Sequence, residues 1–379
     1  MLRRSYRSFV LVCLGAGCSD MASAPAFPLS VQPTSANISA GQTVQLTATP
    51  KDASGKALSD RPITWASDVT SIATVTDGGL VYGVAAGTAT ITGSSKSQTA
   101  TATVTVTVPT PLPPSPETVT FVGAGDIASC SSEGDEATAD LLDGIPGTVF
   151  TAGDNAYSDG SSLNFTNCYQ PSWGKFKDRT RPSPGNHDYH TSNGSGYYAY
   201  YGANAGPAGR GYYSYDLGAW HIVSLNSNVS MSAGSAQEQW LRADLAASTK
   251  LCTLAYWHHP RFSSGTKHGS FSAAQPIWQA LYDAGADVVV SGHEHNYERF
   301  APQDADGTAD PTRGIREFVV GTGGASHYDD EGTPKPNSEV FNGTTWGVIK
   351  FTLGPTSYRW EFVPVAGQGF HDSGTGECH

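Results

Sequence analysis

Two imidazoles stand one residue apart in the sequence Ser-Gly-His-Glu-His at residues 291–295. They follow the run 286–290, which is short, apolar and β-branched and therefore predicts a buried strand that ends near Gly292. Loops beyond the carboxyl ends of strands are where α/β folds bind ligands. Imidazole binds zinc, iron, copper and nickel, so His293 and His295 are candidate metal ligands. Taken alone, this spacing is also that of two ordinary loop histidines.

Ligand-type side chains recur in four other short segments of the same part of the chain. They are Gly125-Asp126, Gly153-Asp154-Asn155-Ala156-Tyr157, Gly185-Asn186-His187-Asp188 and His258-His259-Pro260. In each segment a glycine or proline sets a bend beside a carboxylate, amide, phenol or imidazole. Five such segments, each at or near the end of an expected strand, predict one shared site at one edge of the fold.

The elements that must position these residues alternate between strand and helix from Glu117 onward. Expected strands cover 119–123, 149–152, 221–225, 254–257 and 286–290, and expected helices cover 137–142, 235–247 and 273–284. Alternation of this kind predicts a layered α/β core. Later strands at 317–320, 346–353 and 358–363 have no helices between them, so antiparallel pairing and mixed sheets are expected. Residues 193–215 are rich in tyrosine and glycine and show no usable period.

The order of these segments resembles the signature of the calcineurin-like metallophosphoesterases. Tyr157, three residues after Asp154, and the segment Gly-His-Glu-His-Asn-Tyr-Glu-Arg at 292–299 are similar to the purple acid phosphatase branch of that family. The resemblance covers residues 117 to 300 by motif and the rest of the chain by general pattern. It implies a four-layer α/β/β/α metallophosphoesterase sandwich with two metal ions between the sheet edges.

The resemblance also assigns the ligands of the two ions. It places Asp126, Asp154, Tyr157 and His295 on the first ion and Asp154, Asn186, His258 and His293 on the second, with Asp154 as the bridge. The implied reaction is hydrolysis of a phosphate monoester by metal-activated hydroxide, with His187 assisting the leaving group. His268 lies ten residues after His258, close to where the purple enzymes carry a histidine that contacts phosphate. We expect His268 to contact the substrate, and a surface loop position is the alternative.

Tyr157 bears on the identity of the metals. Many members of the superfamily carry a histidine where this chain has Ala128, and Tyr157 would fill the missing ligand position. The purple branch usually has glycine there, so Ala128 is a small departure. A phenol has a pKa near 10, so ligation as phenolate at neutral pH requires a strongly Lewis-acidic ion. We therefore expect Fe(III) paired with a divalent ion, which could be zinc, manganese or iron.

Other residues near these motifs have interpretations that do not involve ligation. His259 is either a ligand or a packing residue, and His190 and His327 are expected to be structural or exposed. Arg299 is expected to form a structural ion pair rather than to bind phosphate. Asp188 is expected to orient His187 or cap a turn, and Gly321-Thr322-Gly323-Gly324 is expected to form a tight bend near the site.

The start of the chain is typical of an export signal, which predicts a secreted or cell-envelope protein. Three arginines up to Arg7 precede the short apolar stretch 9–17, which is too short to span a bilayer. We assign residues 1–24 to the signal. Its end is either a lipoprotein-type site at Cys18, which would carry a lipid anchor, or a cleavage site within 22–26. No other stretch of the sequence is apolar enough to cross a membrane.

Residues 28–108 form a separate block of short strands that alternate apolar and small polar residues, which predicts an all-β sandwich. The segments 63–67 and 84–91 resemble the bacterial immunoglobulin-like modules of surface proteins. We expect the block to be a spacer that holds the next domain off a cell surface, which it could contact, and ligand binding is the alternative. Residues 109–116, with five prolines, predict a stiff linker to the catalytic domain at 117–379.

Charge and cysteine content narrow the partners and the compartment. A net charge of −12 argues against a nucleic acid as a stable partner, because such a partner requires a basic face. A phosphorylated small molecule is the expected substrate, with bound cations reversing the local field. Four cysteines outside the signal predict two disulfides in an exported domain. Among three pairings we favour Cys130–Cys168 and Cys252–Cys378, and catalytic or metal-binding cysteine is the alternative.

Two further functions remain open on the sequence. The first is a phosphodiesterase or nucleotide pyrophosphatase of the same fold, since the motifs do not distinguish monoesters from diesters. The second is a surface-binding protein that has the fold without catalysis. Degenerate members lose ligands, whereas every ligand position here has a suitable residue type. The sequence therefore favours a phosphomonoesterase.

Overall fold

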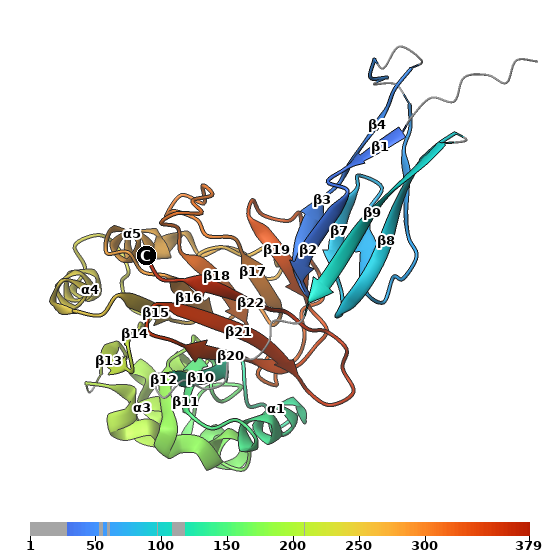
Figure 1. The fold of residues 1–379 in the computed structure, drawn as a ribbon. Helices are drawn as coiled ribbons and strands as arrows, with labels where there is room; N and C mark the ends of the chain where they lie inside the picture. Colours follow the sequence, from blue (N-terminus) through green and yellow to red (C-terminus); the bar gives the residue numbers. More distant parts are fainter. Residues whose placement is uncertain (1–28, 53–55, 59–60, 97, 108–117, 208) are drawn as a thin grey trace, which may run out of the picture. The chain divides into compact units, whose positions relative to one another are not determined.

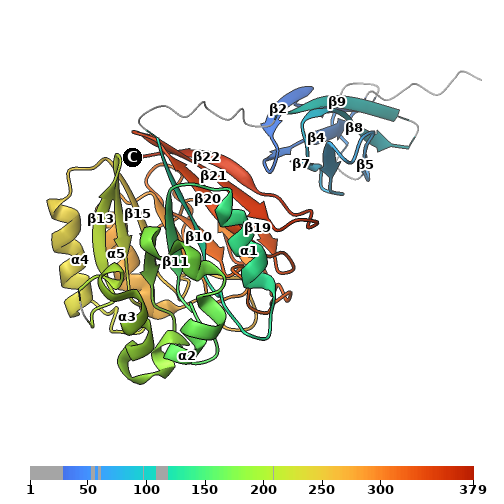
Figure 2. The same ribbon diagram turned by 90° about the horizontal axis from the view of Figure 1, so that it is seen from below.

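The computed structural model describes residues 29–52, 56–58, 61–96, 98–107, 118–207 and 209–379. The expected signal at 1–24, including Cys18, and the expected linker at 109–116 lie outside these residues. The chain divides into two compact units, one that ends at Thr107 and one that runs to His379 (Figures 1 and 2). None of the helices in the described residues is both long and apolar enough to span a membrane.

In its described residues, the first unit contains strands and no helix. They are β1 (Leu29–Gln32), β2 (Ser35–Ser39), β3 (Thr43–Gln45), β4 (Thr47–Pro50), β5 (Thr64–Ser67), β6 (Ala73–Val75), β7 (Leu80–Gly83), β8 (Gly87–Ser95) and β9 (Gln98–Thr107). They form sheets in the orders β2-β9-β8-β5, β3-β7-β6 and β1-β4. In β9, Ala102, Val104 and Val106 are buried and the threonines between them face outward. This alternation confirms the expected all-β sandwich.

The second unit contains two mixed sheets. The six-stranded sheet has the order β12-β11-β10-β20-β21-β22, built from β10 (Val119–Ala124), β11 (Thr148–Ala152), β12 (Thr180–Ser183), β20 (Gly347–Leu353), β21 (Ser357–Pro364) and β22 (Ser373–Glu377). The seven-stranded sheet has the order β13-β14-β15-β16-β18-β17-β19, built from β13 (Tyr213–Leu217), β14 (Trp220–Ser224), β15 (Cys252–Tyr256), β16 (Val288–Ser291), β17 (Tyr297–Phe300), β18 (Arg316–Val320) and β19 (Ser338–Asn342). Strands β10, β11 and β12 are parallel, as are β14, β15, β16 and β18, and the later strands pair antiparallel as expected.

Helices cover the sheets to give the expected four layers. The α-helices are α1 (Gly134–Asp143), α2 (Ser162–Asn164), α3 (Ser195–Tyr201), α4 (Ala236–Ala247) and α5 (Gln275–Asp283). One apolar core joins the facing sides of the two sheets, for example through Phe121 of β10, Phe150 of β11 and Tyr256 of β15. A second core packs α4 and α5 on the other face of the seven-stranded sheet, through residues such as Leu241 and Trp278. The α/β/β/α prediction is therefore confirmed.

Some elements could not be read from the sequence. Strands β12 and β17 are only four residues long, and neither was among the expected strands; β12 ends just before the motif that begins at Gly185, and β17 overlaps the end of the motif at 292–299. Residues 193–215, which showed no period, contain α3, whose Tyr197 and Tyr201 are buried in an aromatic cluster. In that cluster tyrosine replaces the aliphatic residues that a helical pattern depends on. The other expected helices and strands are present with ends shifted by a few residues.

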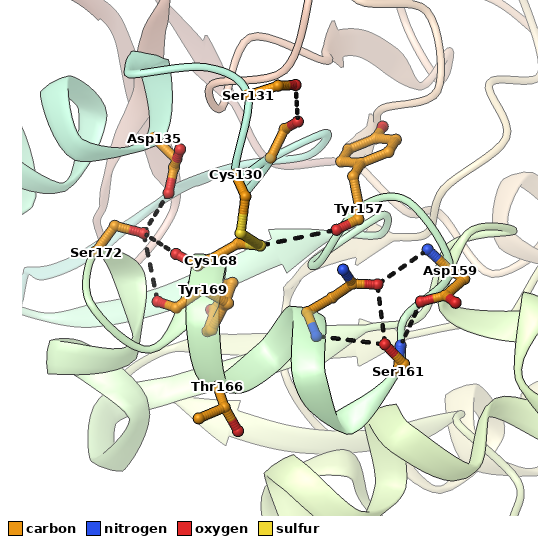
Figure 3. Close-up of a disulfide and its surroundings, with 12 residues drawn as sticks. Cys130, Ser131, Asp135, Tyr157, Asp159, Ser161, Thr166, Cys168, Tyr169 and Ser172 are labelled. Carbon is orange, nitrogen blue, oxygen red and sulfur yellow. Dashed lines mark hydrogen bonds between the residues drawn. A yellow bond between two sulfur atoms is a disulfide. The ribbon is translucent and has the colours of Figure 1, made fainter.

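Both favoured disulfides are present. Cys130 and Cys168 are joined with Cα atoms 4.9 Å apart, and Cys252 and Cys378 with Cα atoms 5.3 Å apart. The first bond fixes the loop after β10 to the short helical segment Phe165–Tyr169, next to the backbone of Tyr157 (Figure 3). The second joins the start of β15 to the residue after β22, and so links one sheet to the other. Cysteine is thus structural in this domain.

Candidate metal centre

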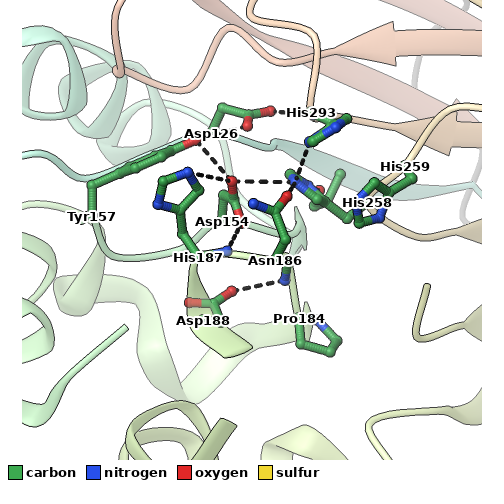
Figure 4. Close-up of polar contacts among 12 residues, drawn as sticks. Asp126, Asp154, Tyr157, Pro184, Asn186, His187, Asp188, His258, His259 and His293 are labelled. Carbon is green, nitrogen blue, oxygen red and sulfur yellow. Dashed lines mark hydrogen bonds and ion pairs between the residues drawn. The ribbon is translucent and has the colours of Figure 1, made fainter. Parts of the chain in front are cut away.

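The five motif segments meet at one edge of the two sheets. Asp126, Asp154 and Asn186 follow the parallel strands β10, β11 and β12, while His258 and His293 follow the parallel strands β15 and β16. The carboxyl ends of parallel strands lie at the same edge of a sheet, and here the labelled side chains that follow strands of both sheets come together (Figure 4). Oxygen donors therefore come from one sheet and imidazoles from the other.

The glycines of the motifs leave room for this convergence. A Cβ atom on Gly292 would lie 2.6 Å from Oδ2 of Asp126, and one on Gly185 would overlap the backbone and carboxylate of Asp154. Any larger residue at either position would displace a candidate ligand. The pairs Gly-Asn and Gly-His are thus explained by close packing around the centre.

Three candidate ligands have left-handed backbone conformations. The φ angles are +59° at Asp126, +49° at Asp154 and +71° at His293. Non-glycine residues seldom adopt this region, and each instance costs on the order of 1–3 kcal/mol. Hydrogen bonds hold two of them in place, from the His293 amide to Asp126 Oδ2 at 2.7 Å and from the His187 amide to Asp154 Oδ1 at 2.8 Å. The surrounding fold therefore fixes the directions of these side chains.

A first group of donor atoms, meaning atoms with a lone pair that could bind a metal ion, surrounds the hydroxyl of Tyr157. This hydroxyl lies 2.8 Å from Oδ1 of Asp126, 3.1 Å from Oδ2 of Asp154 and 3.1 Å from Nε2 of His295. Nδ1 of His295 donates to the carbonyl of Ser326 at 2.5 Å, which leaves Nε2 as an acceptor facing the group. One phenolic proton therefore faces three acceptors.

A second group of donor atoms surrounds Nε2 of His258. Asn186 Oδ1 lies 3.0 Å from it, His293 Nδ1 3.1 Å and Asp154 Oδ2 3.2 Å. Nδ1 of His258 donates to the carbonyl of Ala152 at 2.9 Å, so Nε2 turns its lone pair toward the group. Atoms of Asp154, His258 and His293 all lie within 4.8 Å of one another.

Both groups contain more acceptors than protons, and Asp154 Oδ2 belongs to both. Buried acceptors that face one another are unfavourable unless a proton or a cation lies between them. Carboxylate, amide oxygen, phenol and imidazole are also the donor types that bind transition metals. The residues present therefore fit a pair of cations that share Asp154.

Electrostatics in the centre lead to the same conclusion. Burial opposes the charge on Asp154, but His258 and His187 outweigh it and lower the pKa of this carboxyl. Burial likewise disfavours protonation of His258, yet Asp154 and Asp126 raise its pKa to about 9, so a proton on Nε2 takes the place that a cation would fill. Burial and the neighbouring imidazole of His258 lower the pKa of His293 strongly. The centre as a whole attracts positive charge, and His293 does not supply it, because its lowered pKa keeps this imidazole neutral.

His187 lies beside the two donor groups. Its Nδ1 is 2.6 Å from the carbonyl of Ser158 and donates to it, and its Nε2 lies 3.9 Å from Oδ2 of Asp154. The ring is half-buried and tilts against Tyr157 with centroids 4.5 Å apart. Nε2 thus lies on the side of the ring that faces the carboxylate of Asp154. This position is compatible with the predicted role of His187.

His268 and Tyr328 lie over the imidazoles of the centre. The ring of His268 stacks on His293 with centroids 4.1 Å apart, and the ring of Tyr328 stacks on His295 with centroids 4.0 Å apart. His268 is exposed, so it faces solvent above the donor groups. Sequence reasoning missed Tyr328, although it follows the glycine-rich bend after an expected strand. Burial and Asp126 raise its pKa to about 12, which keeps its hydroxyl protonated as a hydrogen-bond donor.

The remaining motif residues have structural contacts. Nδ1 of His259 lies 2.7 Å from Ser227 Oγ, and its ring packs on Phe271, so its contacts are those of a packing residue. Arg299 pairs with the buried Asp372 at 2.8 Å, which confirms the expected ion pair. His190 lies 3.2 Å from the Ser158 carbonyl, and His327 stacks on Trp346. Asp188 accepts hydrogen bonds from the backbone amides of Gly185 and Asn155. Asp188 therefore anchors a turn, and no contact with the ring of His187 accompanies it among the described hydrogen bonds.

A four-layer sandwich with carboxylates, an amide, a phenol and imidazoles at the facing sheet edges defines a metallophosphoesterase-type domain. Comparison with known families agrees with this class. Residues 119–297 match the calcineurin-like phosphoesterase family, and residues 26–106 match the bacterial Ig-like domain (group 2). The chain thus carries a bacterial Ig-like domain followed by a calcineurin-like phosphoesterase domain.

Among individual proteins the chain is similar to purple acid phosphatases. It is 29 % identical over 241 residues to purple acid phosphatase 15 of Arabidopsis thaliana, which covers 52 % of this chain and 44 % of that protein. It is 28 % identical over 233 residues to probable purple acid phosphatase 20 of the same plant, with 53 % of each chain covered. The chain therefore spans about half the length of these relatives.

Solved structures share the fold. A purple acid phosphatase from yellow lupin (Lupinus luteus) seeds matches with a TM-score of 0.57 and 16 % identity, covering 88 % of this chain and 67 % of that one. GAP50, described as the anchor in the inner membrane complex of Plasmodium, matches with a TM-score of 0.54 and 15 % identity, covering 69 % and 89 %. One fold thus occurs in a phosphatase and in an anchor protein.

Proposed function

We propose that this protein is an exported phosphomonoesterase that uses a two-metal centre. The observation that carries the proposal is the position of Asp154 Oδ2, which lies 3.1 Å from Tyr157 Oη in one donor group and 3.2 Å from His258 Nε2 in the other. A single oxygen shared by two acceptor-rich groups is the arrangement that a pair of adjacent cations requires. The similarity to purple acid phosphatases supports the same function.

Seven residues would hold the two ions. Asp126, Asp154, Tyr157 and His295 would hold the first, and Asp154, Asn186, His258 and His293 the second. When bound, such a pair supplies Lewis acidity to the phosphoryl oxygens and makes a water more acidic. The chain's own contribution is to fix these donors, because the hydrogen bonds of His258 and His295 to backbone carbonyls set their tautomers.

Two histidines would act on the substrate directly. His187 Nε2 faces the site while Nδ1 donates to the Ser158 carbonyl, so Nε2 can deliver a proton to the departing alkoxide. His268, stacked on His293 and open to solvent, would donate to a phosphate oxygen. Phosphate brought between them would meet cations and imidazoles despite the net charge of −12 of the chain.

Turnover of matched esters tests the reaction. We expect the purified protein to hydrolyse p-nitrophenyl phosphate with a kcat/KM at least about a hundredfold above that for bis(p-nitrophenyl) phosphate. A preference for the diester would instead establish the phosphodiesterase alternative. Absence of turnover with either ester, in protein that holds its metals, would support a binding protein such as the anchor that shares the fold.

The first ion is proposed to be Fe(III) and the second a zinc, manganese or iron(II) ion. Burial and the carboxylates of Asp126 and Asp154 raise the pKa of Tyr157 well above its ordinary value, so a phenolate here requires a strong Lewis acid. We expect protein purified from iron-replete cells to show a visible charge-transfer band, and we expect Tyr157→Phe to remove it. The visible spectrum and the metal content are measured on the same preparation. Fully active, colourless and iron-free protein would contradict this assignment.

The proposed location is the cell envelope or the outside of the cell. Two disulfides and a bacterial Ig-like domain are typical of proteins in oxidising, extracellular compartments. The Ig-like domain is proposed as a spacer that holds the catalytic domain away from a surface. Attachment by a lipid at Cys18 is tested by labelling with radioactive palmitate and by its loss in Cys18→Ser.

A further inference from the structure

Three buried glutamates face the loop 261–269, which leaves β15 after His258 and carries His268. They are Glu294, Glu298 and Glu317, each with 0 % of its surface exposed. Glu298 lies in β17 and Glu317 in β18, while Glu294 lies between the candidate ligands His293 and His295. No motif in the sequence assigned a role to any of the three.

Each glutamate accepts hydrogen bonds from backbone amides of this loop. Glu317 accepts those of Arg261 at 2.9 Å and Phe262 at 3.0 Å. Glu298 accepts that of Ser264 at 2.8 Å. Glu294 Oε1 accepts those of His268 at 2.7 Å and Gly269 at 2.5 Å. The carboxylates thus anchor the loop at its beginning, middle and end.

Such contacts restrain a backbone more than ordinary loop hydrogen bonds do. Hydrogen bonds to an ionised carboxylate are about twice as strong as neutral ones, and two amides converge on one oxygen of Glu294. Among the described residues, no lysine or arginine forms an ion pair with Glu294, so the carboxylate depends on the loop amides. Its second oxygen, Oε2, is buried with no partner, which leaves Oε1 and the two amides as the fixed contact.

The anchored end of the loop carries an exposed side chain. The His268 ring lies on His293, with centroids 4.1 Å apart and an interplanar angle of 29°. A histidine in an ordinary surface loop would not need a fully buried carboxylate beneath its backbone. Glu294 also follows His293 directly in the sequence, so one short segment positions a candidate ligand and, through the loop amides, the histidine that stacks on it.

We propose that Glu294 is a positioning residue, whose carboxylate fixes the backbone of His268 and Gly269 so that the His268 imidazole meets the phosphate of the substrate. This inference rests on the proposed function, because it needs phosphate at the centre. It assigns a task to the residue between the two histidines of the Gly-His-Glu-His segment. Glu298 and Glu317 hold the rest of the loop and do not reach His268.

Two substitutions perturb the contact from opposite sides. Glu294→Gln removes the charge and keeps one carbonyl acceptor. Gly265→Ala leaves the ligand segment intact, but its new Cβ would lie 2.6 Å from Cδ of Glu294 and would displace the carboxylate. Asp287→Asn is the matched control, because Asp287 is a buried carboxylate that accepts the amides of Thr253 and His379 at the opposite end of β15.

Binding of inorganic phosphate to the metal-loaded protein, measured by calorimetry, is the main readout. Glu294→Gln and Gly265→Ala should each weaken phosphate affinity about five- to tenfold and raise KM more than they lower kcat. His268→Ala should weaken it at least as much. In the His268→Ala background, Glu294→Gln should have no further effect, and Asp287→Asn should bind phosphate like the original protein.

Several results would overturn the inference. Full, independent effects of Glu294→Gln and His268→Ala would show that Glu294 does not act through His268. Loss of metal in Glu294→Gln, together with unchanged phosphate affinity in Gly265→Ala, would show that Glu294 supports the ligands alone. If the original protein binds phosphate with the expected dependence on Glu294 but hydrolyses no ester, the proposed function fails and the positioning role stands.

Discussion

At its carboxyl end, strand β15 leads into His258, whose Nε2 lies 3.0 Å from Asn186 and 3.2 Å from Asp154 of the six-stranded sheet. At its amino end, Cys252 is bonded to Cys378, which follows β22 of that same sheet. One strand thus connects the two sheets twice. The first connection is polar and rich in acceptors, and the second is covalent.

The polar end of β15 serves function and the covalent end serves stability. At the polar end, Asp126, Asp154 and His293 have left-handed backbones, and acceptors outnumber protons. This arrangement is unfavourable for folding and is retained where chemistry needs it. At the covalent end, a disulfide restricts the unfolded chain and so stabilises the fold. We expect mutations at the two ends to affect different measurements.

The largest effect is expected from Asp154→Asn at the polar end. Loss of the shared carboxylate should lower metal content and reduce kcat/KM by more than about a hundredfold, since even residues that only orient ligands change activity 10–100-fold. Metal analysis and steady-state kinetics check this. Asp287→Asn, at the covalent end, should leave both values unchanged. Retained metal and activity in Asp154→Asn would show that the two donor groups do not share this residue.

His187→Ala should lower kcat about 10²- to 10³-fold for esters with poor leaving groups. Its Nε2 is placed to protonate the departing alkoxide, and p-nitrophenolate needs little such help. The loss should therefore be much smaller with p-nitrophenyl phosphate than with an alkyl phosphate, and metal content should stay the same. An equal loss with both substrates would assign His187 to substrate binding instead.

The polar end was more predictable from sequence than its surroundings were. Asp126 and Asp154 directly follow a glycine and His258 lies two residues before a proline, each at the end of an apolar run, and these features are local in the sequence. Tyr328 could not be found this way, because its stacking on His295 depends on the path of a long loop. The same holds for Glu294, whose contacts with the loop amides exist only after the two segments meet. Aromatic packing in α3 also hid a helix from periodicity.

Removal of the covalent link tests the other half of the comparison. Replacing both Cys252 and Cys378 with serine should lower the free energy of unfolding by about 2–5 kcal/mol and lower Tm accordingly. The metal ligands lie at the far end of β15, so kcat and metal content at 25 °C should change less than about twofold. Thermal denaturation and kinetics on the same preparation measure both. Loss of metal at 25 °C would show that the two ends are coupled.

The smallest effect is expected from the pH dependence of stability at the covalent end. Burial raises the pKa of Asp287 from 3.8 to about 7, while the imidazole of His379 lies 3.3 Å from its Oδ1. The folded protein then holds a proton that the unfolded chain releases at lower pH, so stability should fall as pH rises from 3.8 toward 7. Asp287→Asn should remove the contribution of this residue to the slope and gain about 1–2 kcal/mol relative to the original protein across that window.

Urea unfolding at several pH values between 4 and 8 measures the slope. The free energy of unfolding falls by about 1–3 kcal/mol per molar urea, and extrapolation to zero urea gives its value at each pH. The variant with both Cys252→Ser and Cys378→Ser is the matched control, because it lacks the disulfide at this end of β15 but keeps the Asp287 carboxylate and should therefore keep the slope. Glu317, whose pKa burial raises to about 8, contributes a slope of the same sign that extends one unit further toward alkaline pH, so part of the slope should remain in Asp287→Asn. An undiminished slope in Asp287→Asn would show that Asp287 does not contribute to it, because a buried carboxyl that holds its proton in the folded protein must add to the slope.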